Sequence, residues 1–338
     1  MRAVVYRETG PSSVLSVVDR PAPEPGPGEV RVRIVRSGVN PTDWKFRAGM
    51  MSGYDEVTPG QDGAGVVDAV GPDVAGPAVG DRVWLVLAQN GRAYGTAAEY
   101  TIQPVDRVVA LPDNADFDLG ASIGVPAVTA HRALTAHDGG PTRLGPGTLD
   151  GKVVLVAGGA GAVGNAAIQL ARWSGATVVA TVSSDEKGAL AVAAGAHHTV
   201  NYRAGDPAEA IRTFCPDGVD IAVEVAPAQN ILLDLDVVKV HGLVSIYANN
   251  GGDEMTMPLR AAFGKNLRFQ FLILYTLADQ LVRAATEDVS IAIAAGALRV
   301  GEAAGLPLHH YPLDEAAAAQ DAVEGGAVGK VLIDVAEA

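Results

Sequence analysis

The sequence predicts an α/β protein in which a doubly wound parallel sheet follows a β-rich unit. Between residues 153 and 247, short apolar runs alternate with segments of helical periodicity, which is the pattern of a parallel sheet with crossover helices. Before residue 120, short strand-like segments are separated by Gly and Pro turns, which is typical of a barrel-like all-β unit. A second, smaller stretch of strand-like texture closes the chain.

Composition sets the broad class. The chain has 338 residues, of which 48% are hydrophobic and 19% charged, so we expect about two globular domains. Its apolar runs fall short of the roughly 18 residues of a membrane span, and it begins on a strand without a leader, so we expect a cytoplasmic protein. The net charge of −14 disfavours nucleic acid and anionic membranes as partners. Cys215, the only cysteine, excludes a disulfide framework and a Cys-rich zinc site.

The first 120 residues are predicted to be β-rich. Residues 30–35 alternate between apolar and polar side chains, as a half-buried strand requires. Residues 64–70 and 83–87 form further strands, each bounded by a glycine turn.

From residue 121 the predicted elements change. Residues 121–135 have helical periodicity, and residues 137–151 form a linker rich in Gly and Pro. The predicted strands are 153–157, 177–182, 198–201, 219–225 and 242–247, and the predicted helices between them are 162–174, 185–194, 206–214 and 228–239.

Residues 267–275 form the next predicted strand, which is long and apolar and comes last in the sheet. Because an exposed sheet edge can pair with another chain, we expect a homodimer joined through this strand. Burial of the strand within one subunit is the alternative. A helix at 277–295, residues 306–311, a helix near 314–324 and a strand at 331–335 complete the chain.

The chain is organised around the glycine-rich stretch at residues 152–164. A buried strand at 153–156 leads into Gly159, Gly161 and Gly164, and a helix follows. This strand–turn–helix context is the one in which G-x-G-x-x-G binds a dinucleotide, whose pyrophosphate lies on helix N–H groups. The alternative is a Gly/Ala-rich turn without a ligand. The predicted cofactor contacts here are Gly159, Ala160, Gly161, Ala162 and Val163.

The next strand predicts which dinucleotide binds. It ends at Ser183 and Ser184, where an NAD site usually has an acid for the ribose hydroxyl. Lys187 follows, and Tyr202 with Arg203 ends the neighbouring strand. Hydroxyl and ammonium donors suit a 2′-phosphate, so we predict NADPH. The alternative is that Lys187 lies on a solvated helix face, that Arg203 lies in a surface loop, and that Asp185 binds the ribose.

The sequence resembles the medium-chain dehydrogenase/reductase superfamily, and within it the zinc-independent NADPH:quinone oxidoreductase and alkenal/enone reductase branch. The segments that carry the resemblance are 37–45, 59–66, 79–83, 152–164 and 195–203. It implies a GroES-like β-barrel catalytic domain that begins in residues 1–120, a Rossmann NADPH-binding domain in 121–275, and a helix and return to the catalytic domain in 276–338.

The resemblance also predicts that the chain holds no metal. The zinc-dependent branch has ligands where Asn40, Gln61, Asp62 and Val125 stand, and a cysteine-rich zinc lobe between about residues 85 and 110, where this chain has no cysteine. Without a Lewis acid a simple carbonyl oxygen is poorly stabilised, whereas a conjugated acceptor spreads the negative charge. The implied function is NADPH-dependent hydride transfer to a quinone or an α,β-unsaturated carbonyl. The alternatives are a metal-free carbonyl/alcohol oxidoreductase and an NADPH-binding protein without turnover that serves as a sensor or structural component.

The predicted catalytic residues are Asn40, Lys45 and Tyr54. Asn40 would hold the ribose or the substrate oxygen, unless it only forms a turn before Pro41. Lys45 either polarises an oxygen or is solvated, and Tyr54 would donate a proton or a hydrogen bond. Asp43 is expected to face the cofactor cleft, and Gln61 and Asp62 are expected to line it without catalysing. By the resemblance and by their place at strand ends, the further cofactor contacts are Asn40, Thr129, Val225, Tyr247 and Lys330.

Overall fold

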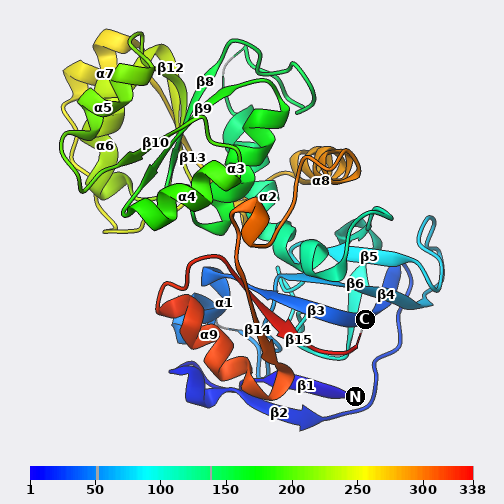
Figure 1. The fold of residues 1–338 in the computed structure, drawn as a ribbon. Coiled ribbons are helices and arrows are strands. Elements are labelled where there is room, and N and C mark those ends of the chain that lie inside the picture. The colour runs from blue at the N-terminus through cyan, green and yellow to red at the C-terminus, as the bar shows by residue number, and fades with distance from the viewer. Residues whose placement is uncertain (51–52, 138, 338) are drawn as a thin grey trace. The chain divides into compact units, whose positions relative to one another are not determined.

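The computed structural model describes residues 1–50, 53–137 and 139–337. The chain divides into two compact units, which are Met1–Val125 with the tail from Pro307, and Pro126–Leu306 (Figure 1). The return to the first unit begins at Pro307, after helix α8 (Asp279–Ala294). This helix belongs to the second unit, because Asp288 on α8 bonds His131 on helix α2 (Phe117–Thr135). In the described part of the chain, no helix is long and apolar enough to cross a membrane.

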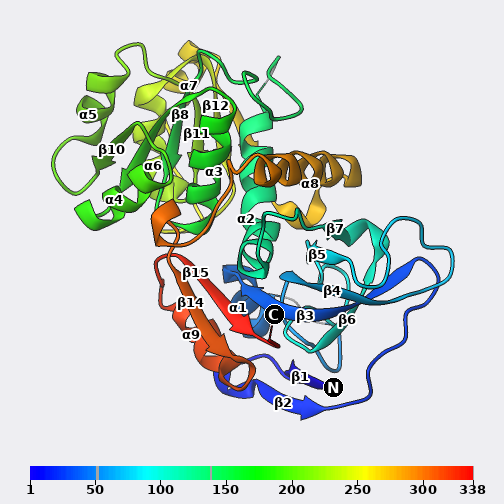
Figure 2. The ribbon, with the colours of Figure 1, turned by 45° about the vertical axis from the view of Figure 1, so that its right-hand side comes forward.

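The first unit is built on a seven-stranded sheet with the strand order β14-β15-β3-β4-β5-β7, and β6 also pairs with β3. Strand β3 buries Val30, Val32 and Ile34 on one face, which confirms the alternation read from the sequence. The C-terminal strands lie beside β3 and are followed easily by their red and orange colour in Figure 2. The bounds are β1 Arg2–Val5, β2 Ser16–Asp19, β3 Glu29–Val39, β4 Asp62–Val70, β5 Arg82–Leu85, β6 Tyr100–Pro104, β7 Val108–Ala110, β14 Leu308–Pro312, β15 Lys330–Asp334, α1 Pro41–Lys45 and α9 Ala316–Glu324.

A short helix that the sequence did not predict follows β3. Asn40 is its N-cap, Pro41 stands in its first turn, and the Asp43 side chain reaches back to the Asn40 N–H at 2.7 Å. A π-helical turn, Phe46–Met50, continues the chain. The turn before Pro41, which was the alternative to a role of Asn40 in the cleft, is a helix start, and its capping geometry holds the Asn40 backbone in place.

The second unit is a six-stranded parallel sheet with the order β10-β9-β8-β11-β12-β13. Figure 1 shows α3 and α4 on one side of this sheet and α5 and α6 on the other. The chain order reverses between β8 and β11, and in doubly wound sheets ligands bind at the carboxyl ends of the strands at such a point. The bounds are β8 Val153–Ala157, α3 Ala162–Trp173, β9 Thr177–Val182, α4 Asp185–Ala193, β10 His198–Asn201, α5 Pro207–Phe214, β11 Val219–Glu224, α6 Pro227–Val237, β12 Val238–Ile246, α7 Leu259–Lys265 and β13 Arg268–Phe271.

Strand β13 lies at the sheet edge, as the sequence predicted, but it is shorter than expected. It ends at Phe271, opposite Ile246, which is the last residue of its neighbour β12. Because no ladder partner continues beyond Ile246, the chain turns into a 3₁₀ helix at Leu274–Thr276. The prediction of a strand over 267–275 is thus wrong about its length, and its place at the edge of the sheet is confirmed.

The buried carboxylate of Asp288 connects α8 to α2 in the second unit. The Asp288 carboxylate accepts hydrogen bonds from His131 Nε2 and Arg143 Nε, both at 2.8 Å, and from the Leu144 N–H at 2.7 Å. Burial alone would raise the pKa of Asp288, but these donors lower it to about 2. This histidine is therefore a structural partner within the unit.

Candidate functional site

The glycine turn of the second unit has the shape that a phosphate cradle needs. Strand β8 ends at Ala157, and Gly158 takes a left-handed φ of 68°. A Cβ added to Gly164 would lie 2.3 Å from the Gly158 carbonyl oxygen, and one added to Gly159 would lie 2.8 Å from the Ala180 Cβ. Side chains are thus excluded at both positions, and the helix α3 packs directly on the turn.

The N-terminus of α3 can accept an anion. Its N-cap is Gly161, so no side chain bonds the N–H groups of the first turn. Ala162 and Val163 begin the helix half-buried, and Ala160 is buried beneath them. A dinucleotide pyrophosphate fits this arrangement because it would pair with those N–H groups and with the positive end of the helix dipole.

The residues predicted to read the adenosine ribose lie together. The register pairs Asn201 of β10 with Val182 of β9, which places Tyr202 next to Ser183, and the Tyr202 N–H donates to the Val182 carbonyl at 3.1 Å. Ser184 caps α4 by accepting from the Lys187 N–H at 3.4 Å. The Lys187 ammonium forms no ion pair within the described residues.

Asp185, the acid that would favour NADH, has another partner. Its carboxylate accepts from Asn201 Nδ2 at 3.2 Å. The surroundings of Ser183 therefore offer hydroxyl groups and one uncommitted ammonium. Contact of these groups with the cofactor remains a prediction.

Val225 and Tyr247 follow neighbouring strands at the same edge of the sheet. A Cβ on Gly158 would lie 3.4 Å from Val225 Cγ1, so the valine packs beside the glycine turn. The Tyr247 N–H donates to the Glu224 carbonyl at 3.1 Å. Burial, together with the charge of Glu224, raises the pKa of the Tyr247 phenol. Thr129 is a buried residue of α2, and its contact with the cofactor also stays a prediction.

The sequence reasoning missed a buried acidic pair behind this edge. Glu224 accepts from Asn230 Nδ2 at 3.1 Å, and one helical turn later Asp234 has no hydrogen-bond partner within the described residues for either oxygen. Burial raises the pKa of both carboxyls, that of Asp234 well above its usual value. An acidic residue ending an otherwise apolar strand was the available signal for this pair.

In the first unit, three adjacent strands bring Asn40, Asp62 and Lys330 together. The register pairs Val39 with Val331 and Gly38 with Asp62, so all three side chains lie at one end of β3. The Lys330 ammonium donates to Asn40 Oδ1 at 2.8 Å and to Asp62 Oδ2 at 3.3 Å. Asn40 Nδ2 donates to Asp62 Oδ2 at 2.7 Å.

These groups, with Asp43, form what we call the buried ion cluster of the first unit. The exposed fractions of Asn40, Asp62 and Lys330 are 2%, 0% and 2%. Burial raises the pKa of Asp62 and lowers that of Lys330, while the attraction between the two charges opposes both shifts. Burial also raises the pKa of Asp43 to about 7. The cluster therefore holds two carboxyl groups against a single ammonium.

The cluster changes how two predicted residues are understood. Asn40 and Lys330 were predicted as separate cofactor contacts, and the structure joins them to each other and to Asp62. The partnership was not visible in the sequence because 268 residues separate Asp62 from Lys330. The available signal was a lysine at the start of a short apolar strand.

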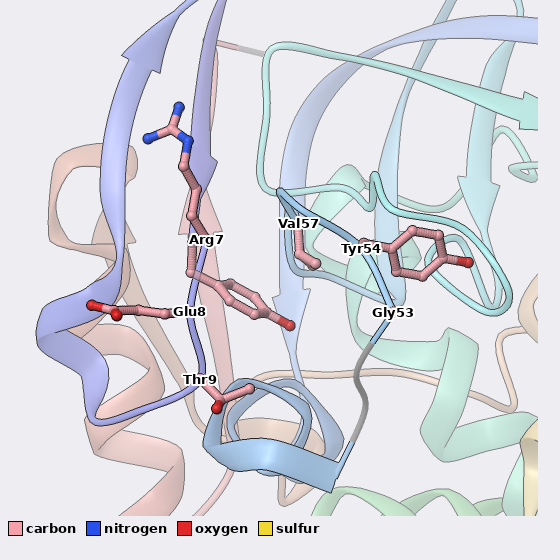
Figure 3. A pocket seen from close by; sticks show the side chains of 7 residues that line it. Arg7, Glu8, Thr9, Gly53, Tyr54 and Val57 are labelled. Atoms are coloured by element: carbon pink, nitrogen blue, oxygen red, sulfur yellow. The ribbon is translucent and has the colours of Figure 1, made fainter.

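Lys45 and Tyr54 lie outside this cluster. The Lys45 ammonium is 5.7 Å from the centre of the Trp44 ring, and the Tyr54 side chain is 41% exposed. Tyr54 borders a cavity within the first unit that Tyr6 and Val57 also line. Figure 3 shows the Tyr54 ring turned away from the wall formed by residues 7–9. The catalytic roles of Lys45 and Tyr54 remain predictions.

The ion cluster makes a prediction about stability. Replacing Lys330 by Met leaves Asp62 buried without a cation, so we expect the first unit to lose about 3–5 kcal/mol of unfolding free energy in urea titrations. The double variant Lys330→Met, Asp62→Asn removes both charges and should recover a large part of that loss. Independent, additive costs in the double-mutant cycle would show that the two groups do not interact.

Both units are similar to known protein families. Residues 26–113 match the family model of the alcohol dehydrogenase GroES-like domain, and residues 162–294 match that of the zinc-binding dehydrogenase. The quinone oxidoreductase of Sus scrofa is 31% identical over 97% of this chain and 96% of its own length. A 2-haloacrylate reductase from a Burkholderia species is 29% identical over 98% of both chains.

Two solved structures share the whole fold. An NAD-dependent alcohol dehydrogenase superposes with a TM-score of 0.87 at 31% identity, covering 99% of this chain and 100% of its own. A mycobacterial protein in complex with NADPH superposes with a TM-score of 0.83 at 28% identity, covering 98% and 99%. The chain is thus an oxidoreductase that uses a nicotinamide dinucleotide, and it belongs to the medium-chain dehydrogenase/reductase superfamily, in the branch of the quinone oxidoreductases.

Proposed function

We propose that this enzyme is an NADPH-dependent, zinc-independent reductase that transfers hydride to a quinone or an α,β-unsaturated carbonyl. The observation that carries the proposal is the buried ion cluster. Asn40 and Asp62 stand where the resemblance places metal ligands, and their side chains already bond each other and the Lys330 ammonium. Within the described residues no three His, Cys, Asp or Glu side chains are grouped as metal ligands. The side chains at this place therefore do not fit a zinc ion.

The remaining residues are suited to holding the cofactor. NADPH supplies the hydride when it is bound. The uncapped start of α3 would bind its pyrophosphate, and Val225 lies where a strand-end residue would form a wall beside it. Ser183, Ser184, Lys187 and Tyr202 would hold the 2′-phosphate by hydrogen bonds and charge.

The substrate class follows from what such a site can stabilise. Without a metal, hydride transfer is easiest to an acceptor that delocalises the resulting charge, and hydrogen-bond donors need only stabilise a diffuse oxyanion. Both named relatives support this class, since a quinone and a haloacrylate are conjugated acceptors. Metal-free oxidation of an alcohol is the second candidate, because the superposed alcohol dehydrogenase is NAD-dependent.

One assay series tests the function. We expect NADPH consumption with 1,4-benzoquinone or cyclohex-2-enone, much slower consumption with butanal, and no reduction of NAD⁺ by ethanol. Elemental analysis of the purified protein should find far less than one zinc per chain. Ethanol oxidation by a protein without zinc would favour the second candidate, and stoichiometric zinc would defeat the proposed zinc independence. NADPH consumption with butanal alone would defeat the proposed substrate class.

The cofactor preference depends on the uncommitted ammonium of Lys187. Lys187→Ala should weaken NADPH binding by about tenfold or more, because a charge-assisted hydrogen bond to the 2′-phosphate is lost, while NADH binding stays within about twofold. The control is Lys152→Ala, which precedes β8 at the end opposite the glycine turn. It should change neither NADPH binding nor NADH binding. Fluorescence titration of the reduced cofactors measures both constants. Equal weakening of NADPH and NADH would show that Lys187 does not bind the 2′-phosphate.

We also propose a homodimer formed through the edge strand β13. Phe271 on this strand is 61% exposed, and α7, which packs against β13 through Ala262 and Phe269, exposes Leu259 and Phe263. Sedimentation at micromolar concentration should give the dimer mass for the wild type and the monomer mass for Phe271→Glu. Ile291→Glu, an exposed residue of α8, should remain dimeric. A monomeric wild type would exclude this assembly.

A further inference from the structure

A cavity in the first unit lies between two chain segments that are joined at one end. Its lining comes from residues 6–9 on one side and from Gly53, Tyr54 and Val57 on the other (Figure 3). The Tyr6 and Val57 backbones exchange two hydrogen bonds of 2.9 Å, and Arg7 pairs with Glu56 at 2.6 Å. The two walls are therefore joined at one end by an antiparallel bridge and an ion pair.

The far end of the first wall is held by a buried arginine. Arg47 Nη1 donates to the Gly10 carbonyl at 2.6 Å, and the Gly10 N–H donates to the Arg47 carbonyl at 3.0 Å. The same guanidinium bonds Gln320 at 2.7 Å and Glu324 at 3.0 Å on α9. The segment 7–9 is thus stretched between two anchored points, which preorganises the wall without any ligand.

The size of the cavity limits its guest. Its volume is about 160 Å³. A cavity of about 150 Å³ in another protein holds one benzene molecule. Space for one six-membered ring is available here, and the further rings of a fused polycyclic molecule would project out of the cavity.

Among the polar side chains of the lining, that of Tyr6 is buried, whereas those of Arg7, Glu8, Thr9 and Tyr54 are exposed. The Tyr6 side chain is buried, and the Gln89 amide lies beside its phenol oxygen. Gln89 is itself fully buried, and neither of its amide atoms has a hydrogen bond of normal geometry within the described residues. Buried amide atoms without hydrogen bonds lower the stability of the fold, so we expect a further polar group to bond the Gln89 amide.

The electrostatics keep Tyr6 available as a donor. Burial raises the pKa of the Tyr6 phenol, while the neighbouring Gln89 amide and the Arg47 charge oppose that shift. Burial thus favours the protonated form of the Tyr6 phenol. With the amide beside the phenol oxygen, the hydroxyl proton is free to bond an oxygen in the cavity.

We propose that this cavity binds the ring of a monocyclic acceptor and that the Tyr6 hydroxyl donates a hydrogen bond to the acceptor's oxygen. The inference rests on the proposed function and adds its substrate size and a donor that the sequence did not single out. The bond strengthens as hydride transfer places negative charge on that oxygen, which is when a preorganised donor is most effective. Tyr54 is less suited to this role because its ring turns away from the wall of residues 7–9.

The first experiment removes the donor. Tyr6→Phe should lower kcat/KM for 1,4-benzoquinone by at least about tenfold without changing the NADPH dissociation constant. Tyr100→Phe removes a hydroxyl from strand β6, outside the cavity, and should leave kcat/KM unchanged. The wild-type enzyme should also prefer 1,4-benzoquinone to the tricyclic 9,10-phenanthrenequinone in kcat/KM. A wild-type kcat/KM in Tyr6→Phe would overturn the role of the hydroxyl.

The second experiment does not require turnover. Phenol, a single-ring probe that cannot accept hydride, should bind the wild type in saturation-transfer NMR and lose that binding in Thr9→Trp, which fills the cavity from an exposed position. Thr213→Trp, an exposed residue of α5, is the matched control. Equal phenol binding in Thr9→Trp and wild type would overturn the cavity assignment.

The two experiments separate the two proposals. Phenol binding that depends on Thr9, in a protein that consumes no NADPH with any acceptor, would retain the ring site and defeat the proposed function. Normal quinone turnover in both Tyr6→Phe and Thr9→Trp would defeat the ring site and retain the proposed function.

Discussion

The buried pairing of Lys330 with Asp62 is the constraint on which the architecture of the first unit depends. A charge taken out of water is tolerated only when another charge and further hydrogen bonds surround it. Asp62 lies on β4 and Lys330 on β15, so the pair forms only when the C-terminal tail returns to the N-terminal sheet. The first unit combines an N-terminal and a C-terminal segment, and one buried ammonium that faces one buried carboxylate joins them.

The same return holds other parts of the unit in place. Val125 on α2 donates its N–H to the second oxygen of Asp62 at 2.7 Å, so the carboxylate is bonded on both oxygens. Helix α9 adds a second long-range tie through the buried Arg47. The groups closest to the proposed chemistry are therefore positioned by strands and helices distant in the chain, and their precision comes from packed elements and not from loops.

The two units contribute different kinds of chemistry. The second unit offers backbone N–H groups at a glycine turn and small polar side chains at neighbouring strand ends, which suit phosphate groups. The first unit offers a buried cluster with one ammonium, two carboxyl groups and one carboxamide, and a cavity with a tyrosine hydroxyl. The proposed metal-free reductase would need both contributions, because phosphate-binding groups would hold the hydride donor and hydrogen-bond donors would stabilise the acceptor.

The sequence by itself determined the features that depend on near neighbours in the chain. The alternation of strands and helices, the glycine turn at Gly159 to Gly164 and the serines that follow β9 result from local patterns. The edge position of β13 follows from strand order. Only the tertiary structure decided that Asn40 bonds Lys330, that Tyr6 faces Val57, and that β13 stops where β12 ends. Each of these depends on a partner supplied by another strand or segment. A hydrogen-bond partner far away in the chain is chosen by strand register and packing, which the local sequence does not encode.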